Sequence, residues 1–142
     1  MGILKYIAGK LYSNDKEVAL VDDGSGIESS TLPNGYWTKY PDGTYIVSEN
    51  IVTGATIVCS TQAGSLFYGV RNNVPINISG GQFMDAPTLV VIGIAASGGT
   101  IDGAVTLGLP SGITPTEFSV AATCWATGGT ITVGYTAIGR WK

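Results

Sequence analysis

The chain has 142 residues, a formal net charge of −3 at pH 7 and no histidine. A chain of this length is expected to form one domain and to bury about 68–70% of its unfolded surface. The acidic balance, without a basic cluster, argues against nucleic acid and against an anionic membrane surface as ligands. Only 12% of the residues are charged, and 21 are glycine. This composition favours β-structure with hydroxyl-bearing outer faces, in a subunit that hides part of its surface in an oligomer.

No targeting signal stands out in this sequence. The first residues lack the apolar segment of a signal peptide, and the apolar run at 89–96 is too short for a transmembrane helix. We therefore expect no membrane insertion.

Cys59 and Cys124 form no metal-binding spacing. Cysteine is often a buried core residue, and a protein made in a reducing cytoplasm keeps its thiols, so we expect two unbridged thiols.

The N-terminal part reads as a separate segment. Residues 2–21 contain short alternating runs broken by turn residues, typical of small strands that are too few to form their own core. A plain hairpin or a partly disordered arm is the alternative. Residues 22–33 are acidic and contain Gly and Ser, which is typical of a linker. The sequence therefore divides into an N-terminal attachment or shaft segment with its linker, 1–33, and a head domain, 34–142.

A turn opens the head. In Pro41-Asp42-Gly43, proline presets φ, aspartate can accept a hydrogen bond from the backbone two residues on, and glycine accepts positive φ. Aromatic residues flank this turn on both sides. The pattern predicts the first β-hairpin of a β-domain.

Later strands follow at short spacing. Residues 74–78 alternate around a proline, which predicts an edge strand. Residues 87–94 are apolar on both phases, so we expect burial on both faces, or one face at a subunit interface. Two Gly-Gly pairs in a repeated context predict two tight hairpins, 88–94 with 100–107 and 118–126 with 130–138. The whole favours an all-β, antiparallel β-sandwich head.

Phase in the last predicted hairpin separates core from surface. Phe118, Val120, Ala122 and Cys124 share one phase and are predicted to be core, as are alternate residues of 131–137. Trp125 falls on the opposite phase, among Ser and Thr. This tryptophan is a ligand platform, a subunit-interface anchor or an ordinary packing residue.

Catalytic chemistry is not visible. Without histidine there is no Ser-His-Asp or Cys-His nucleophile and no ordinary zinc site. Asp85, Asp102 and Glu117 lie in turn-rich contexts that are typical of solvated carboxylates rather than of a catalytic pair. We expect no enzyme activity, no catalytic residues, no metal and no cofactor.

Several segments resemble one known family. Residues 35–44 (GYWTKYPDGT) resemble the segment that opens the C-terminal head of many bacteriophage tail-fibre proteins, and residues 135–142 (YTAIGRWK) look like the way those heads end. Segments 75–78 (PINI), 86–91 (APTLVV) and 118–120 (FSV) are similar to the family's other strands. The short runs before residue 22 resemble the β-repeats of trimeric fibre shafts. The strands between 48 and 66 do not match the family.

The resemblance implies an H-type-lectin-like β-sandwich that assembles as a homotrimer on the virion and binds a host-surface glycan or protein receptor. It also implies contacts with other virion proteins through residues 1–33. We expect receptor contacts at one end of the sandwich, from Trp125, the Gly-Gly tips and a loop formed by Arg71, Asn72 and Asn73, whose side chains offer hydrogen bonds to sugar hydroxyls. The alternatives are a purely structural decoration, collar or head-fibre subunit, and a non-viral carbohydrate-binding module.

Overall fold

The computed structural model describes residues 4–7, 10–13, 16–17, 26–97 and 105–142. Every regular element in these ranges is a β-strand, and all the strand pairs are antiparallel. Within the same ranges no helix is long and apolar enough to span a membrane. The prediction of an all-β, antiparallel fold is confirmed.

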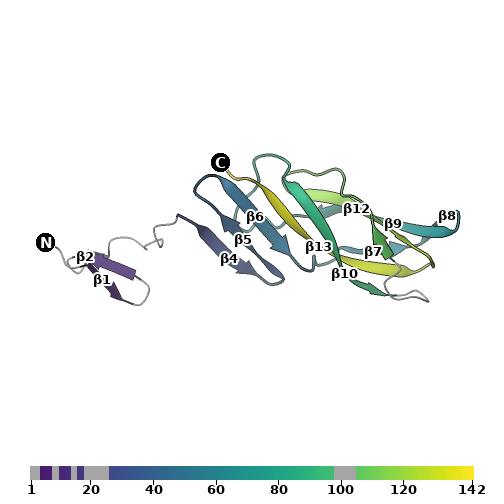
Figure 1. The fold of residues 1–142 in the computed structure, drawn as a ribbon, viewed down its shortest axis with the longest axis horizontal. Coiled ribbons are helices and arrows are strands. Elements are labelled where there is room, and N and C mark those ends of the chain that lie inside the picture. Colours follow the sequence, from purple (N-terminus) through teal and green to yellow (C-terminus); the bar gives the residue numbers. More distant parts are fainter. Residues whose placement is uncertain (1–3, 8–9, 14–15, 18–25, 98–104) are drawn as a thin grey trace.

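The strands form three sheets (Figure 1). A small N-terminal sheet holds β1 (Leu4–Ile7), β2 (Lys10–Ser13) and β3 (Lys16–Glu17). The large sheet has the order β10-β13-β6-β5-β4, with β7 also paired to β13; its strands are β4 (Glu28–Leu32), β5 (Gly35–Lys39), β6 (Thr44–Glu49), β7 (Thr56–Cys59), β10 (Thr88–Ser97) and β13 (Gly129–Arg140). The four-stranded sheet has the order β11-β12-β9-β8; its strands are β8 (Thr61–Ala63), β9 (Leu66–Pro75), β11 (Val105–Leu107) and β12 (Glu117–Cys124).

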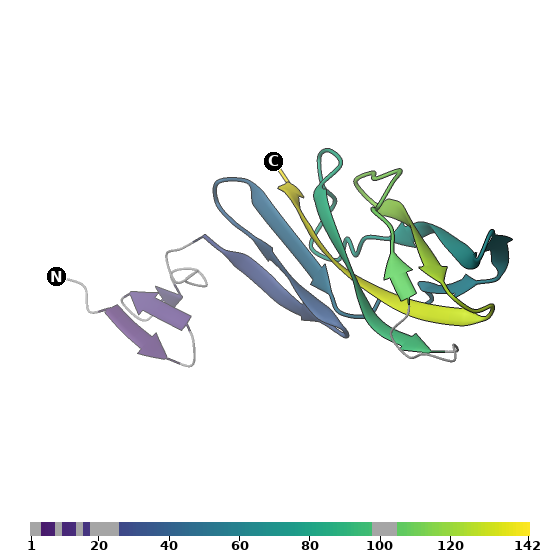
Figure 2. The ribbon, with the colours of Figure 1, turned by 45° about the vertical axis from the view of Figure 1, so that its right-hand side comes forward.

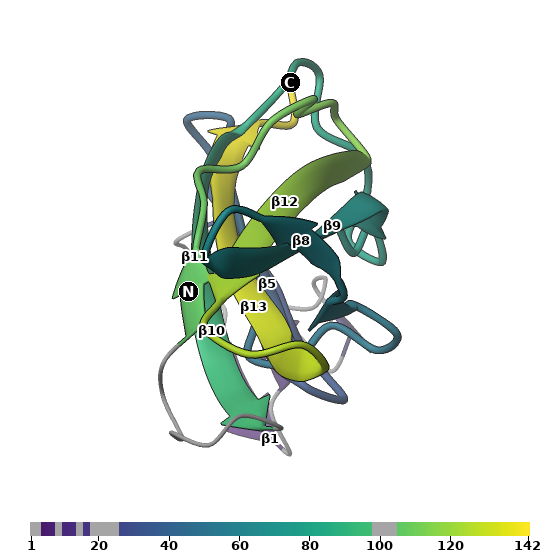
Figure 3. The same cartoon turned by 90° about the vertical axis from the view of Figure 1, so that its right-hand side faces the viewer.

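The core lies between the large sheet and the four-stranded sheet. In Figure 3 strand β12 crosses in front of strand β13, which belongs to the other layer. Phe118, Val120 and Ala122 are buried, as predicted, and the Phe118 ring meets the Tyr135 ring edge-on at 5.7 Å between centroids. Full burial of a side chain such as Phe118 contributes about 1.5–3 kcal/mol to stability.

The Pro41-Asp42-Gly43 turn forms as predicted between β5 and β6. The Thr44 amide donates to Asp42 Oδ1 at 2.7 Å, and Gly43 has a φ of 92°. This side-chain bond holds the turn in the geometry that the residue types favour.

The two predicted Gly-Gly hairpins are wrong as strand pairs. Strand β12 pairs with β9 and β11, whereas β13, the long yellow strand in Figure 2, pairs with β10. Gly128, with a φ of 80°, therefore turns the chain from one sheet into the other. Two strands with matched inward phases can lie side by side or face each other across a core, and these face each other. The first Gly-Gly pair, at 98–99, lies outside the described residues.

Strand β10 shows only one face to the core. Leu89 and Val91 pack against the core, whereas Val90 is 58% exposed and Ile92 is also exposed. Burial on both faces is therefore wrong for the single chain. The alternative, a face at a subunit interface, stays a prediction.

Two other sequence expectations meet the sheet edges. The predicted edge strand at 74–78 is wrong, because β9 ends at Pro75, residues 76–78 belong to no strand, and β9 lies inside its sheet between β12 and β8. Pro75 is nevertheless tolerated there, since β8 pairs only with the first residues of β9 and leaves Pro75 without a partner on that side. Residues 28–32, which the sequence places in a linker, form strand β4 instead and pair along their whole length with β5. The large sheet thus begins on the N-terminal side of residue 33, while the division into segments at that residue stays a prediction.

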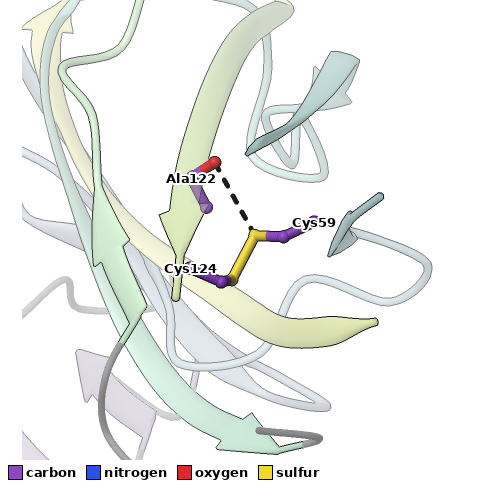
Figure 4. Close-up of a disulfide and its surroundings, with 3 residues drawn as sticks. All are labelled: Cys59, Ala122 and Cys124. Carbon is purple, nitrogen blue, oxygen red and sulfur yellow. Dashed lines mark hydrogen bonds between the residues drawn. A yellow bond between two sulfur atoms is a disulfide. The ribbon is translucent and has the colours of Figure 1, made fainter. Parts of the chain in front are cut away.

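The expectation of two unbridged thiols is wrong, because Cys59 and Cys124 form a disulfide. Figure 4 shows the bond joining the end of β7 to the end of β12, so it links the two layers of the sandwich. The bonded Cys59 sulfur carries no hydrogen, and its 3.7 Å approach to the Ala122 carbonyl oxygen is a packing contact. Composition and an assumed compartment could not reveal that the fold places the two Cα atoms 6.1 Å apart, within the range that a disulfide requires.

Candidate functional site

The segments that open and close the head lie together at one end of the sandwich. The Trp141 amide donates to the Gly43 carbonyl oxygen at 3.0 Å, and the Trp141 indole N–H donates to the Tyr40 carbonyl oxygen at 3.1 Å. The Lys39 ammonium lies 4.8 Å from the Trp141 ring centroid and 5.4 Å from that of Tyr45. These cation–π and backbone contacts hold Trp141 against the β5–β6 hairpin.

Arg71, Asn72 and Asn73 do not form the expected loop. They lie within strand β9, where the pairing with β12 shifts register between Phe118 and Val120. The extra residue on β9 is accommodated by a β-bulge, and Asn73 has a φ of 55°, a conformation that asparagine adopts more readily than most residues. All three side chains are exposed. The sequence missed the bulge because its polar run looks the same in a loop and at an exposed edge.

Trp125 is 69% exposed and follows the last residue of β12. The outer face of the four-stranded sheet leads up to it. On that face Thr123 pairs with Tyr68 and Ala121 pairs with Val70, which is 52% exposed. Ordinary packing, one of the three readings of Trp125, is thus wrong for the single chain. An exposed indole beside an apolar and hydroxyl-bearing sheet face can contact a partner or a sugar ring.

The residues predicted to bind a receptor do not form one cluster. Arg71 pairs with Val120, whereas Trp125 lies beyond Cys124, the partner of Phe67. At about 3.3 Å per residue this separates Arg71 from Trp125 by roughly 16 Å along the strand. Asn72 and Asn73 lie farther still from Trp125. Each of these residues stays a candidate, but a single small ligand cannot contact them all.

A cleft that the sequence did not reveal lies between the two layers. Its volume is about 300 Å³, and its lining consists of one carboxylate, two amides, one hydroxyl and three apolar side chains: Glu49, Asn34, Asn77, Thr53, Pro33, Val52 and Pro75. These residues come from the β4–β5 turn, the end of β6 with the segment after it, and the end of β9 with the segment after it. No spacing in the sequence unites these three segments. Pairing of β5 with β6 places the β4–β5 turn beside the end of β6, and the packing of the two sheets adds the end of β9.

Glu49 is held in this cleft by a hydrogen-bonded network. The Tyr135 hydroxyl donates to Glu49 Oε2 at 2.9 Å and accepts from the backbone amide of Asn77 at 2.6 Å. The side-chain Nδ2 of Asn77 donates to Glu49 Oε1 at 3.4 Å. Burial, and to a smaller extent the charge of Glu49, raise the pKa of Tyr135 well above its ordinary value, against a lowering by the Asn77 amide. The phenol therefore stays protonated and remains a donor to the carboxylate.

Among the described residues no group of three or more His, Cys, Asp or Glu side chains is placed to hold a metal ion. The side chains of the cleft and of the Trp125 surface offer hydrogen-bonding groups and apolar contact area. Comparisons of this chain with models of protein families, with curated proteins and with solved structures found no match.

Proposed function

We propose that this chain is a bacteriophage virion fibre protein whose β-sandwich head acts as a trimer and binds a host-surface receptor, a glycan in the first instance. The observation that carries the proposal is the exposed Trp125 at the end of β12. The resemblance of residues 35–44 and 135–142 to the ends of tail-fibre heads supports the family assignment. The disulfide is compatible with this location, because such bonds persist on virion surfaces.

Trp125 suits a receptor contact for physical reasons. A tryptophan offers a large rigid surface and one N–H donor, and covering its exposed apolar area with a ligand or partner is favourable. Its indole can cover the apolar face of a pyranose. A shallow site of this kind binds weakly on its own and gains strength when several copies act together. A trimeric head supplies these copies.

The outer face of the large sheet is suited to self-association. Register places uncharged side chains there, including Val90 opposite Thr136, Ser48 opposite Thr136, and Tyr36 opposite Ser48. Ile138 and Ile92 add further exposed apolar area. Depletion of charge is characteristic of the centre of subunit interfaces. We therefore assign the trimer contact to this face, and leave the opposite layer free for a receptor.

The experiment compares Trp125→Ala with Arg71→Ala in adsorption of particles, or of purified head, to host cells. Light scattering gives the oligomer mass of each variant. We expect Trp125→Ala to lose adsorption with the trimer intact, because its side chain lies on the layer away from the proposed contact. Dissociation of the trimer by Trp125→Ala would instead make this residue an interface anchor. Unchanged adsorption in both variants would favour a purely structural virion subunit.

A matched pair of valines tests the subunit contact. Val90→Glu places a charge on the outer face of the large sheet and Val70→Glu on that of the four-stranded sheet, at similar exposed fractions of 58% and 52%. We expect Val90→Glu to give monomers and Val70→Glu to leave the trimer intact, because burying an unpaired charge at an interface is costly. A 14.6 kDa species for the unaltered protein at micromolar concentration would refute the trimer.

A further inference from the structure

We propose that the cleft beside Glu49 binds a cationic, hydroxyl-bearing ligand, and that an amine-bearing sugar is its simplest example. The inference goes beyond the proposed function, since it concerns a second site between the two layers rather than the surface around Trp125. It rests on the charge in the cleft, on the donors that already hold it and on the shape of the walls.

The charge comes first. Each carboxylate oxygen of Glu49 accepts one hydrogen bond from a neutral group: Oε2 from the Tyr135 hydroxyl, and Oε1 from the side-chain amide of Asn77. A carboxylate offers about four lone-pair sites, and these two bonds occupy only some of them. The residues lining the cleft include no lysine and no arginine. The negative charge therefore faces the cleft without a compensating cation in the lining, and a ligand with an ammonium group supplies one.

The remaining groups define the body of the ligand. The side-chain amide of Asn34 and the hydroxyl of Thr53 each provide donors and acceptors, which match vicinal hydroxyls. Pro33, Val52 and Pro75 provide apolar walls against which a ring can lie. A volume of about 300 Å³ is at the lower end for ligand sites, which suits a single sugar ring better than a larger molecule.

A purely structural role for Glu49 is the competing explanation, since the same carboxylate joins Tyr135 of the large sheet to Asn77 beyond the end of β9. The two explanations differ in what they require of charge. A structural role needs no charge, because a glutamine carbonyl still accepts from the Tyr135 hydroxyl and only the long 3.4 Å bond from Asn77 Nδ2 loses its acceptor. Recognition of an ammonium group needs the negative charge itself.

The test uses three probes of one ring shape and different charge: D-glucosamine, D-glucose and D-glucuronate. Each is titrated to tens of millimolar into the whole isotope-labelled protein, because single-sugar affinities are weak. The side-chain amide signals of Asn34 and Asn77 and the backbone signal of Thr53 report binding. We expect glucosamine to bind at least about tenfold more tightly than glucuronate, with glucose between them. Absence of shifts with glucosamine, or equal binding of glucuronate, would overturn the proposal without any variant.

Two variants complete the experiment. Glu49→Gln is expected to lower glucosamine affinity about tenfold, to the level of glucose, while the melting temperature changes little. Trp125→Ala is expected to leave the cleft signals and their titration unchanged. Full glucosamine affinity in Glu49→Gln, or loss of the shifts in Trp125→Ala, would each refute the site. Failure here leaves the adsorption experiment unaffected, because that experiment uses cells and a different surface.

Discussion

Removing the disulfide is expected to cost a large part of the stability of the sandwich. Cys59 and Cys124 are separated by 65 residues in the sequence, and cross-linking a loop of this length lowers the entropy of the unfolded chain. The chain-entropy relation gives about 4 kcal/mol at 25 °C for such a loop. A small domain is stable by only about 5–15 kcal/mol, so this is a substantial share. The corresponding fall in melting temperature is about 10–20 °C.

The double variant Cys59→Ala/Cys124→Ala tests this expectation without leaving a single reactive thiol. Thermal and urea unfolding of the variant are compared with those of the native protein, unfolded once without reductant and once with it. The reduced native protein is the matched control, because it lacks the bond but keeps both sulfur atoms. Both forms without the bond should melt at similar temperatures, well below the oxidised protein. Two reactive thiols in freshly prepared, denatured and unreduced protein would refute the reasoning, as would a double variant that melts within about 2 °C of the oxidised protein.

Three further predictions concern single side chains. Tyr135→Phe should destabilise the head by about 1–3 kcal/mol in urea unfolding, because the Asn77 backbone amide and the Glu49 carboxylate both lose the hydroxyl that they share. The control variant Tyr36→Phe, on the exposed outer face, should change the free energy of unfolding very little. Gly69→Ala should prevent stable folding, because the new methyl group would overlap a backbone carbonyl of β7. In the control variant Gly108→Ala the methyl group meets only ordinary van der Waals contacts. Soluble yield and melting temperature of the two variants test this difference. Hydrogen bonds from Thr44 hold the pKa of Asp42 below its ordinary value of 3.8. The ionised carboxylate therefore stabilises the fold above pH 3.8, and this contribution is lost as the pH falls through the lowered pKa. Asp42→Ala should accordingly make the free energy of unfolding less dependent on pH at the acid end.

Local patterns in the sequence predicted local structure well. The turn at 41–43 and the inward phase of 118–124 follow from residue types and alternation alone, since both depend on neighbours within a few residues. Alternation does not say which strand lies alongside and which lies opposite, and this is why β12 and β13 were predicted as a hairpin. The bond between Cys59 and Cys124 was missed for a related reason, because it depends on the stacking of two sheets.

The candidate site was less predictable than the fold. Trp125 could be singled out because a tryptophan on a Ser and Thr phase contradicts the core pattern. The Arg71–Asn73 bulge carries the same residue types as a loop, so only the register of β9 against β12 distinguishes them. Glu49 is the last residue of β6, and nothing in the sequence around it marks it as a site residue. Val52 and Thr53 lie close to it in the sequence, but Asn34 and Asn77 reach the cleft only through strand pairing and sheet packing.

Strand β13 has a consequence for how the protein is made. It pairs with β10 along one edge and with β6 and β7 along the other, and it is synthesised after every other strand described here. While the chain is being synthesised, β6, β7 and β10 lack their common partner strand, so their unpaired edges are exposed to neighbouring chains. Long-range pairing of this kind folds slowly and invites association between incomplete chains. Folding of the large sheet is therefore an event that follows translation of residue 129 and beyond, and slowing synthesis before that point should increase aggregation rather than assist folding.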